Sequence, residues 1–167
     1  MSEHIKQGLS EILSAAAICE LDEWIAKYPQ NQRQSAVMQA LMLLQQAQGF
    51  LPVEGMDAVA LYLDMPKISV YEVASFYSMY EQSPTGRHVI NVCTNISCHL
   101  NGSSAIVRHL EDKLKIKSGE TTPDGRFTLR TVECLAACVN APMMQVGQQY
   151  HEHLTSATVD AILDNYV

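Results

Sequence analysis

The 167-residue sequence lacks several features that would assign it to a common functional class. None of its eight glycines stands two positions from another, so the glycine-rich fingerprint of dinucleotide-binding and phosphate-binding loops is absent. No stretch approaches the ~20 apolar residues that a membrane-spanning helix requires. Lysine and arginine are scarce, 11 against 18 aspartates and glutamates, and form no cluster. The net charge of −7 argues against a nucleic-acid-binding protein.

We expect no secretion signal, because residues 1–8 are polar and contain no apolar run. The odd number of cysteines, five, does not suit a protein stabilised by disulfides. We therefore expect a chain that stays in a reducing, cytoplasmic-type compartment. A hydrophobic content of 47% and a charged content of 17% are typical of a folded globular protein of one ordinary domain or two small ones.

The charge is distributed unevenly along the chain. Residues 1–85 contain four Lys and Arg against ten Asp and Glu, a net charge of −6. Residues 86–167 contain seven against eight, a net charge of −1. The turn-forming segment Ser83-Pro84-Thr85-Gly86 separates the two regions. We predict a helical domain over 1–85 and a second domain over 86–167.

Apolar residues in the first region recur every three or four positions, which predicts helices. Four helices are expected, with these apolar faces: Ile18, Leu21, Ile25 and Tyr28; Val37, Leu41 and Leu44; Met56, Val59, Ala60 and Leu63; Val73, Phe76, Tyr77 and Tyr80. Ser14 is a suitable N-cap for the first helix, and Ser69 with Glu72 forms a capping box for the last. We interpret the Met and Tyr residues here as mainly core.

The second region alternates between strand and helix patterns. Four strands are expected, over 88–92, 127–132, 143–146 and 149–154, with Ile90 and Val92 pointing inward. A turn over 122–125 precedes the second strand. One helix begins at Asn101 or Gly102, and Thr155 caps another near the C-terminus. The predicted order is therefore β, α, β, β, β, α.

Four of the five cysteines form two pairs, Cys93 with Cys98 and Cys134 with Cys138, separated by 35 residues. Each pair follows a predicted strand end, where α/β folds place their sites. Iron with bridging sulfide prefers thiolate ligands, and a 2Fe-2S cluster takes four cysteines. A short pair can supply both ligands of one iron, so two distant pairs suit one cluster.

Other interpretations of these cysteines have to be weighed. Structural zinc also takes paired cysteines, but zinc ribbons favour two intervening residues, and here the pairs enclose four and three. Two disulfides do not suit a chain without a secretion signal. Inert buried cysteines would be scattered rather than paired. The spacing favours an iron–sulfur cluster and leaves zinc as the nearest alternative.

The remaining candidate residues have simpler interpretations. Cys19 lies beside apolar residues in a predicted helix, and we expect it in the core. His99 follows Cys98, but with four cysteines available it is expected near the site or at the surface rather than as a Rieske-type ligand. His151 and His153 share one face of a predicted strand, and we expect polar surface rather than a metal site.

Three segments carry a resemblance to a known family: Ala74-Ser75-Phe76-Tyr77-Ser78-Met79-Tyr80, Cys93-x4-Cys98-His99-Leu100-Asn101-Gly102, and Glu133-Cys134-Leu135-Ala136-Ala137-Cys138-Val139-Asn140-Ala141-Pro142-Met143-Met144. Together with Gly125-Arg126-Phe127-Thr128 they resemble the thioredoxin-like 2Fe-2S ferredoxins that form the E subunit of bacterial NADH–quinone oxidoreductase, respiratory complex I. The resemblance runs from about residue 14 to the end. It departs at Ala136, where the family usually has glycine. If that position takes a positive φ, alanine strains the loop by about 1 kcal/mol.

This resemblance implies an α+β fold, with an N-terminal helical bundle followed by a thioredoxin-like α/β domain. It implies one 2Fe-2S cluster per chain, held by Cys93, Cys98, Cys134 and Cys138. The chain would be a non-catalytic electron-transfer subunit of NADH–quinone oxidoreductase, without a complete active site of its own. Its partners would be a subunit that binds FMN and NADH and exchanges single electrons with the cluster, and other peripheral-arm subunits. It would be cytoplasmic, or at the cytoplasmic face of the inner membrane without inserting into it.

Two alternatives remain open at this point. The chain could be the equivalent subunit in the diaphorase module of an NAD-linked hydrogenase or formate dehydrogenase, with the same cluster chemistry. It could instead be a zinc-binding, non-redox adaptor whose helical half recruits a partner. Metal content separates the second alternative, and the co-purifying subunits separate the first.

Overall fold

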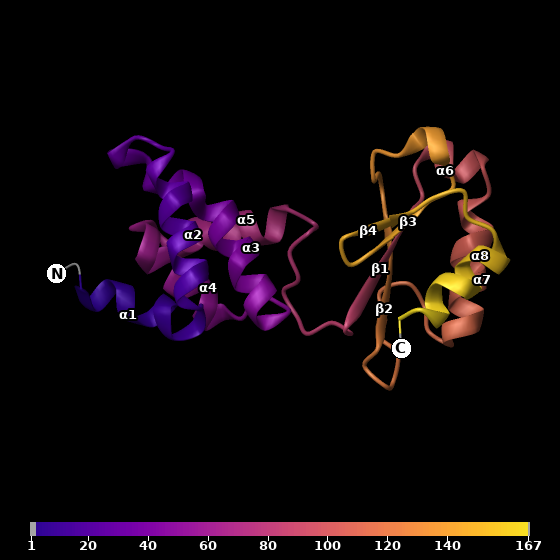
Figure 1. Ribbon diagram of the computed structural model, residues 1–167, viewed down its shortest axis with the longest axis horizontal. Coiled ribbons are helices and arrows are strands. Elements are labelled where there is room, and N and C mark those ends of the chain that lie inside the picture. The colour runs from indigo at the N-terminus through magenta and orange to yellow at the C-terminus, as the bar shows by residue number, and fades with distance from the viewer. Residues whose placement is uncertain (1–2, 167) are drawn as a thin grey trace. The chain divides into compact units, whose positions relative to one another are not determined.

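The structure, a computed structural model, describes residues 3–166, with the side chains of residues 8–166. Residues 1–2 and 167, at the outer ends of the two predicted domains, lie outside the described residues. The chain divides into two compact units between Pro84 and Thr85 (Figure 1). Helices together with one four-stranded sheet confirm the predicted α+β class. None of the described helices is long and apolar enough to cross a membrane.

Every regular element described in the first unit is a helix. Its elements are α1 (Glu3–Ile12), α2 (Ala15–Ala26), the 3-10 helix η1 (Gln30–Ala36), α3 (Val37–Gln48), α4 (Val53–Leu63) and α5 (Lys67–Phe76). The Ser14 hydroxyl accepts a hydrogen bond from the Ala17 N–H at 3.2 Å, which confirms the predicted cap of α2. The predicted apolar positions of α3 and α4 are all buried: Val37, Leu41, Leu44, Met56, Val59, Ala60 and Leu63. This unit therefore has a hydrophobic core of its own.

The start and the end of α5 differ from the prediction. The helix begins at Lys67 with Pro66 as its N-cap, and Ser69 makes no capping hydrogen bond, so the predicted capping box is wrong. Proline before a helix presets φ and needs no N–H partner, so α5 can begin before Ser69. The helix ends at Phe76, whose side chain is 80% exposed rather than in the core. Tyr80 still reaches the core and donates to the Met38 carbonyl at 2.8 Å.

Cys19 is exposed on α2, so its predicted place in the core is wrong. Leu21 is the buried residue of this helix, with Ile18 and Ile25 packed against the same core. Cys19 is four positions before the exposed Glu23, so it lies on the solvent face of the helix.

The second unit contains the sheet. Its elements are β1 (His88–Cys93), α6 (Ile96–Leu100), α7 (Ser103–Leu114), β2 (Phe127–Val132), the 3-10 helix η2 (Cys138–Asn140), β3 (Met144–Val146), β4 (Gln149–His151) and α8 (Ser156–Asp164). The predicted order of four strands and two longer helices is confirmed, with the short α6 and η2 in addition. The strand order is β2-β1-β3-β4. Strands β1 and β2 are parallel, and the other two pairings are antiparallel.

Helices α7 and α8 pack together, and Figure 1 shows both of them on one side of the sheet. Ile90 and Val92 of β1 are fully buried, which confirms their predicted inward orientation, and Phe127 and Leu129 of β2 join the same core. Thr155 caps α8 and accepts from the Thr158 N–H at 3.2 Å, also as predicted. The second unit is thus a two-layer α/β structure with a core separate from that of the helices.

The outer edge of β2 is covered by the segment that leads into it. The Gly119 N–H donates to the Leu129 carbonyl at 2.7 Å, and the Leu129 N–H donates to the Glu120 carbonyl at 3.0 Å. The Gly125 N–H then donates to the Thr122 carbonyl at 2.8 Å, which confirms the predicted turn. Strand β4, with three residues, forms the opposite edge of the sheet.

Candidate metal centre

The strand register places the two cysteine pairs beyond the C-terminal ends of the parallel strands β1 and β2. Cys93 is the last residue of β1 and pairs with Val132, the last residue of the parallel strand β2. Cys134 follows Val132 by two residues, so both chain segments leave the sheet together. The Thr94 N–H donates to the Val132 carbonyl at 2.9 Å and continues the ladder one step beyond the strands.

The first pair is buried. Cys93 is 2% exposed and Cys98, in α6, is 1% exposed. Both pack against Met143, which is fully buried. The Cys93 N–H donates to the Met143 carbonyl at 3.2 Å, and the Cys93 thiol donates to the Glu133 carbonyl at 3.7 Å. These contacts fix the first pair within the fold.

Helix α6 positions Cys98. The Asn95 side chain caps this helix and accepts from the Ile96 N–H at 2.8 Å. A five-residue helix has too few positions for a periodic apolar pattern, which is why it was not predictable from the sequence. The helix returns the chain toward β1 and places the Cys98 side chain against Cys93.

Burial raises the pKa of the Cys98 thiol, and its hydrogen bond and charge interaction with Cys93 act in the same direction. A backbone hydrogen bond with Met143 lowers the pKa, and the charge of Cys138 raises it. Cys138, from the second pair, therefore lies close enough to Cys98 to be felt electrostatically. Neighbouring thiols oppose one another's deprotonation because the thiolates would repel. A bound metal cation offsets that repulsion and stabilises the thiolates.

The second pair is exposed. Cys134 and Cys138 lie in the connection between β2 and β3, with Cys138 as the first residue of η2. The Ala136 N–H donates to the Cys134 sulfur at 3.3 Å. Backbone N–H groups that contact a ligand sulfur orient it and tune the metal held there.

Ala136 adopts a φ of +60°. The position therefore takes the left-handed conformation for which glycine is the usual choice. From the sequence we expected strain at this residue if its φ were positive, and it is. An alanine in this conformation costs roughly 1 kcal/mol. The same conformation presents the Ala136 N–H to Cys134, so the strained residue is also one that contacts a candidate ligand.

All five cysteines are free thiols, so the structure contains no disulfide at the candidate site. Cys93, Cys98 and Cys138 lie in one neighbourhood, whereas Cys134 contacts its own loop. Among the side chains of residues 8–166, no three or more His, Cys, Asp or Glu are arranged to hold a metal ion together. The donor set nevertheless suits a soft metal centre, because it offers four thiols from two chain segments beyond the C-terminal ends of β1 and β2.

The three candidate histidines have surroundings of their own. His99 is exposed, and its Nδ1 lies 3.2 Å from the Ser104 hydroxyl. His151 lies in β4 with its Nε2 3.1 Å from the Tyr166 hydroxyl, and burial lowers its pKa. His153 lies beyond β4 with a φ of +49°, so the predicted shared strand face is wrong. The left-handed residue ends the strand before the alternation can bring the two rings together.

Two features around the cysteines were not predicted from the sequence. Met143 was expected as an ordinary strand residue, but it precedes β3 and covers Cys93 and Cys98. Three large apolar side chains near the cysteines are exposed: Ile96 at 70%, Leu100 at 78% and Val139 at 95%. Their positions within two residues of Cys98 or Cys138 were the available signal. Exposed apolar groups around a candidate site are typical of a surface that a partner covers.

Comparison with known proteins gives consistent matches. The sequence profile of the family described as thioredoxin-like [2Fe-2S] ferredoxin matches residues 21–167. The NADH-quinone oxidoreductase E subunit 2 of Rhizobium meliloti (strain 1021) is 48% identical over 88% of this chain and 86% of its own length. The NADH-quinone oxidoreductase E subunit of Rickettsia typhi (strain ATCC VR-144 / Wilmington) is 45% identical over 86% of this chain and 85% of its own.

Among solved structures, a chain of an NAD+-reducing [NiFe]-hydrogenase in the H2-reduced state superposes with a TM-score of 0.67 at 24% identity. The match covers 76% of this chain but 22% of the hydrogenase chain. At this identity the likeness establishes a shared fold and nothing about the complex in which the chain works.

Proposed function

Because the chain belongs to the thioredoxin-like [2Fe-2S] ferredoxin family, we propose that it binds one 2Fe-2S cluster and serves as an electron-transfer subunit of an NADH–quinone oxidoreductase. The observation that carries this proposal is the register of β1 and β2, which brings both cysteine pairs to the C-terminal ends of these two strands. The ligands are Cys93, Cys98, Cys134 and Cys138. When bound, such a cluster supplies one-electron redox chemistry.

The residues of this chain divide the work of holding the centre. Met143 keeps water from Cys93 and Cys98, and the low exposure of these two thiols supports a rigid, dry half-site. The Ala136 N–H donates to the Cys134 sulfur and orients it. The exposed second pair provides the side of the site at which electrons pass to and from a partner.

We assign FMN and NADH to a partner subunit. The sequence has no glycine-rich nucleotide-binding loop, so hydride chemistry needs another chain. The exposed Ile96, Leu100 and Val139 support a contact surface around the cysteines for that flavin subunit. In this assignment the chain is part of a peripheral arm at the cytoplasmic face of the membrane and has no complete active site alone.

The Rhizobium and Rickettsia relatives favour the quinone-reducing complex over a hydrogenase or formate dehydrogenase module. The superposition on the hydrogenase chain is below the identity at which function follows, so it does not favour that alternative. Purification of the tagged chain from its own cells, followed by identification of its stable partners, tests the assignment. A hydrogenase or formate dehydrogenase catalytic subunit among them would overturn it.

The cluster itself is tested on anaerobically purified protein by an absorption spectrum with iron, sulfide and zinc assays on one sample. We expect a red-brown protein with about two irons and two sulfides per chain. A colourless protein that contains one zinc, and that gains no sulfide on reconstitution with iron and sulfide, would establish the zinc-binding adaptor instead.

A further inference from the structure

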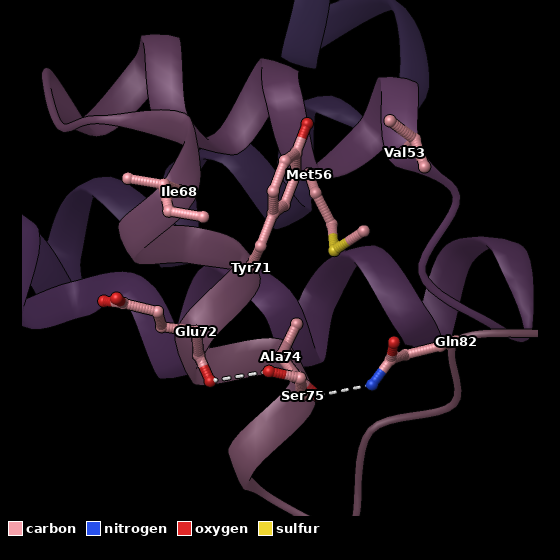
Figure 2. A pocket seen from close by; sticks show the side chains of 8 residues that line it. All are labelled: Val53, Met56, Ile68, Tyr71, Glu72, Ala74, Ser75 and Gln82. Carbon is pink, nitrogen blue, oxygen red and sulfur yellow. Dashed lines mark hydrogen bonds between the residues drawn. The ribbon is translucent and has the colours of Figure 1, made fainter.

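The helical unit carries a groove that the cluster chemistry does not use. It lies between the start of α4 and the length of α5, and we call it the α4–α5 groove. Its volume is about 250 Å³, and it is lined by Val53, Met56, Ile68, Tyr71, Glu72, Ala74, Ser75 and Gln82. Figure 2 shows Met56 and Tyr71 at its centre, with Ile68 and Glu72 on one side and Val53 and Gln82 on the other.

The groove is held open by contacts within the unit. Tyr71 donates a short hydrogen bond to Asp57, and Asp57 also accepts from Lys67 at 2.6 Å. Gln82 donates to the Ala74 carbonyl at 3.4 Å (Figure 2), which ties the chain after α5 to the groove wall. The Tyr71 ring therefore has a fixed orientation, and the groove does not depend on a ligand for its shape.

Apolar side chains form the floor of the groove and part of its rim. Met56 and Ala74 are buried beneath it, at 7% and 2% exposure. Ile68 and Val53 at the rim are 62% and 56% exposed, an arrangement that costs hydration free energy unless something covers them. A cavity of about 150 Å³ with apolar walls accepts a benzene-sized group. The groove is therefore large enough for one leucine, methionine or aromatic side chain.

The charges around this apolar patch are negative. Glu72 lines the groove and is exposed. The pKa of Tyr71 is raised mainly by the hydrogen bond that Tyr71 donates to Asp57, then by burial and the charge of Asp57, and last by the charge of Glu54, the residue after Val53. Among the described lining residues there is no Lys or Arg. The nearby Lys67 is paired with Asp57. A ligand with matching chemistry combines one bulky apolar group with positive charge.

We propose that the α4–α5 groove binds a segment of a partner protein, in which one large apolar side chain enters the groove and a neighbouring Lys or Arg pairs with Glu54 and Glu72. A second copy of this chain is a poor occupant, because residues 1–85 carry a net charge of −6 and two such units repel. An anionic membrane surface or a nucleic acid is disfavoured by the same rim. This inference goes beyond the proposed function, since it concerns a unit without a cluster ligand.

Photocross-linking in the full-length chain tests this inference. Benzoylphenylalanine replaces Ile68 in the groove rim or, as a matched control, the exposed Ala26 on α2, and the protein is irradiated in its own cells. We expect the cross-linked partner peptide to contain a bulky apolar residue with a Lys or Arg within four positions of it. The cross-link yield from position 68 should be about tenfold higher than the yield from position 26. Cross-links to a second copy, to lipid, or to peptides without a basic residue would overturn the inference. Equal yields from both positions would do the same.

A charge reversal provides the second arm. Glu72→Lys should lower the yield of the position-68 cross-link by about tenfold, and Glu72→Gln should lower it less. Glu23→Lys on α2 makes the same change of charge outside the groove and should leave the yield unchanged. If Glu72→Lys and Glu23→Lys act alike, only net charge matters and the groove is not the docking site. Iron and sulfide content, measured on the same samples, reports separately on the proposed cluster.

Discussion

The two cysteine pairs have the same residue type and opposite surroundings. Cys93 and Cys98 are buried against Met143, in a strand end and a capped helix. Cys134 and Cys138 are exposed on a connection that includes a left-handed alanine. The first pair is fixed by the packing of the fold, whereas the second pair is placed only by the local backbone. A metal centre that joins them would gain its rigidity from one side and its accessibility from the other.

The largest expected effect is the loss of the metal centre when one exposed cysteine is replaced, which leaves the buried pair without a complete partner pair. Cys134→Ser should cost the protein most of its iron and sulfide, because a cluster that lacks one of four thiolates is poorly held. The measurement is the visible spectrum with iron and sulfide assays. Cys19→Ser, which alters an exposed cysteine outside the pairs, is the control and should keep the full content. An unchanged spectrum in the Cys134→Ser variant would remove that residue from the ligand set.

A smaller effect measures the difference between the pairs directly. In the cluster-free chain, iodoacetamide should modify Cys134 and Cys138 more than about tenfold faster than Cys93 and Cys98, because the buried thiols react only after local opening. Mass spectrometry of the digested protein follows each cysteine against time. Equal rates for all four would show that the first pair is not held by packing. Loading the cluster should then protect both pairs.

Removing the Met143 side chain, which covers Cys93 and Cys98, should make the first cysteine pair more like the exposed second pair. Met143→Ala deletes a fully buried side chain and should lower the free energy of unfolding by about 2–5 kcal/mol in urea titration. Val139→Ala, at a side chain that is 95% exposed, should change it by no more than about 0.5 kcal/mol. If Met143→Ala were equally mild, the burial of Cys98 would not depend on this side chain.

The smallest effect concerns the loop of the second pair. Ala136→Gly should raise the free energy of unfolding by up to about 1 kcal/mol, because glycine adopts the φ of +60° without steric cost. Ala137 has a φ of −111°, so Ala137→Gly relieves no strain and should be destabilising by about 0.5–1 kcal/mol. Chemical denaturation of the cluster-free protein compares the two variants. Equal shifts would mean that Ala136 carries no strain.

Regular elements with strong patterns were predictable from the sequence. Each expected apolar position of α4 is buried, from Met56 to Leu63, because an eleven-residue helix repeats its stripe often enough to be recognised. Strand β1 was predictable from the alternation of its buried residues, and it extends one residue beyond the expected range, to Cys93. The start of α5 was not, because Pro66 and Ser69 both suit a helix N-terminus and local chemistry alone does not choose between them.

Within the candidate site, residue identity was predictable and environment was not. The spacing of the cysteines selects them as a set, but Cys98 is buried against Met143, which is 45 residues away in the sequence. The sequence alone did not predict the left-handed conformation of Ala136, because alanine does not favour it. Only the strain that would follow from a positive φ was predictable. The exposure of Val139 beside the second pair likewise follows from tertiary packing, which no local pattern records.

The segment over 119–122 that covers the outer edge of β2 matters for the newly made chain before any metal reaches it. An open strand edge is a template on which other chains can add strands and aggregate. Here the Gly119 and Glu120 backbone groups occupy the edge at Leu129, and the remaining edge, β4, is three residues long. Both edges of this sheet therefore offer few free backbone groups for edge-to-edge pairing with another chain.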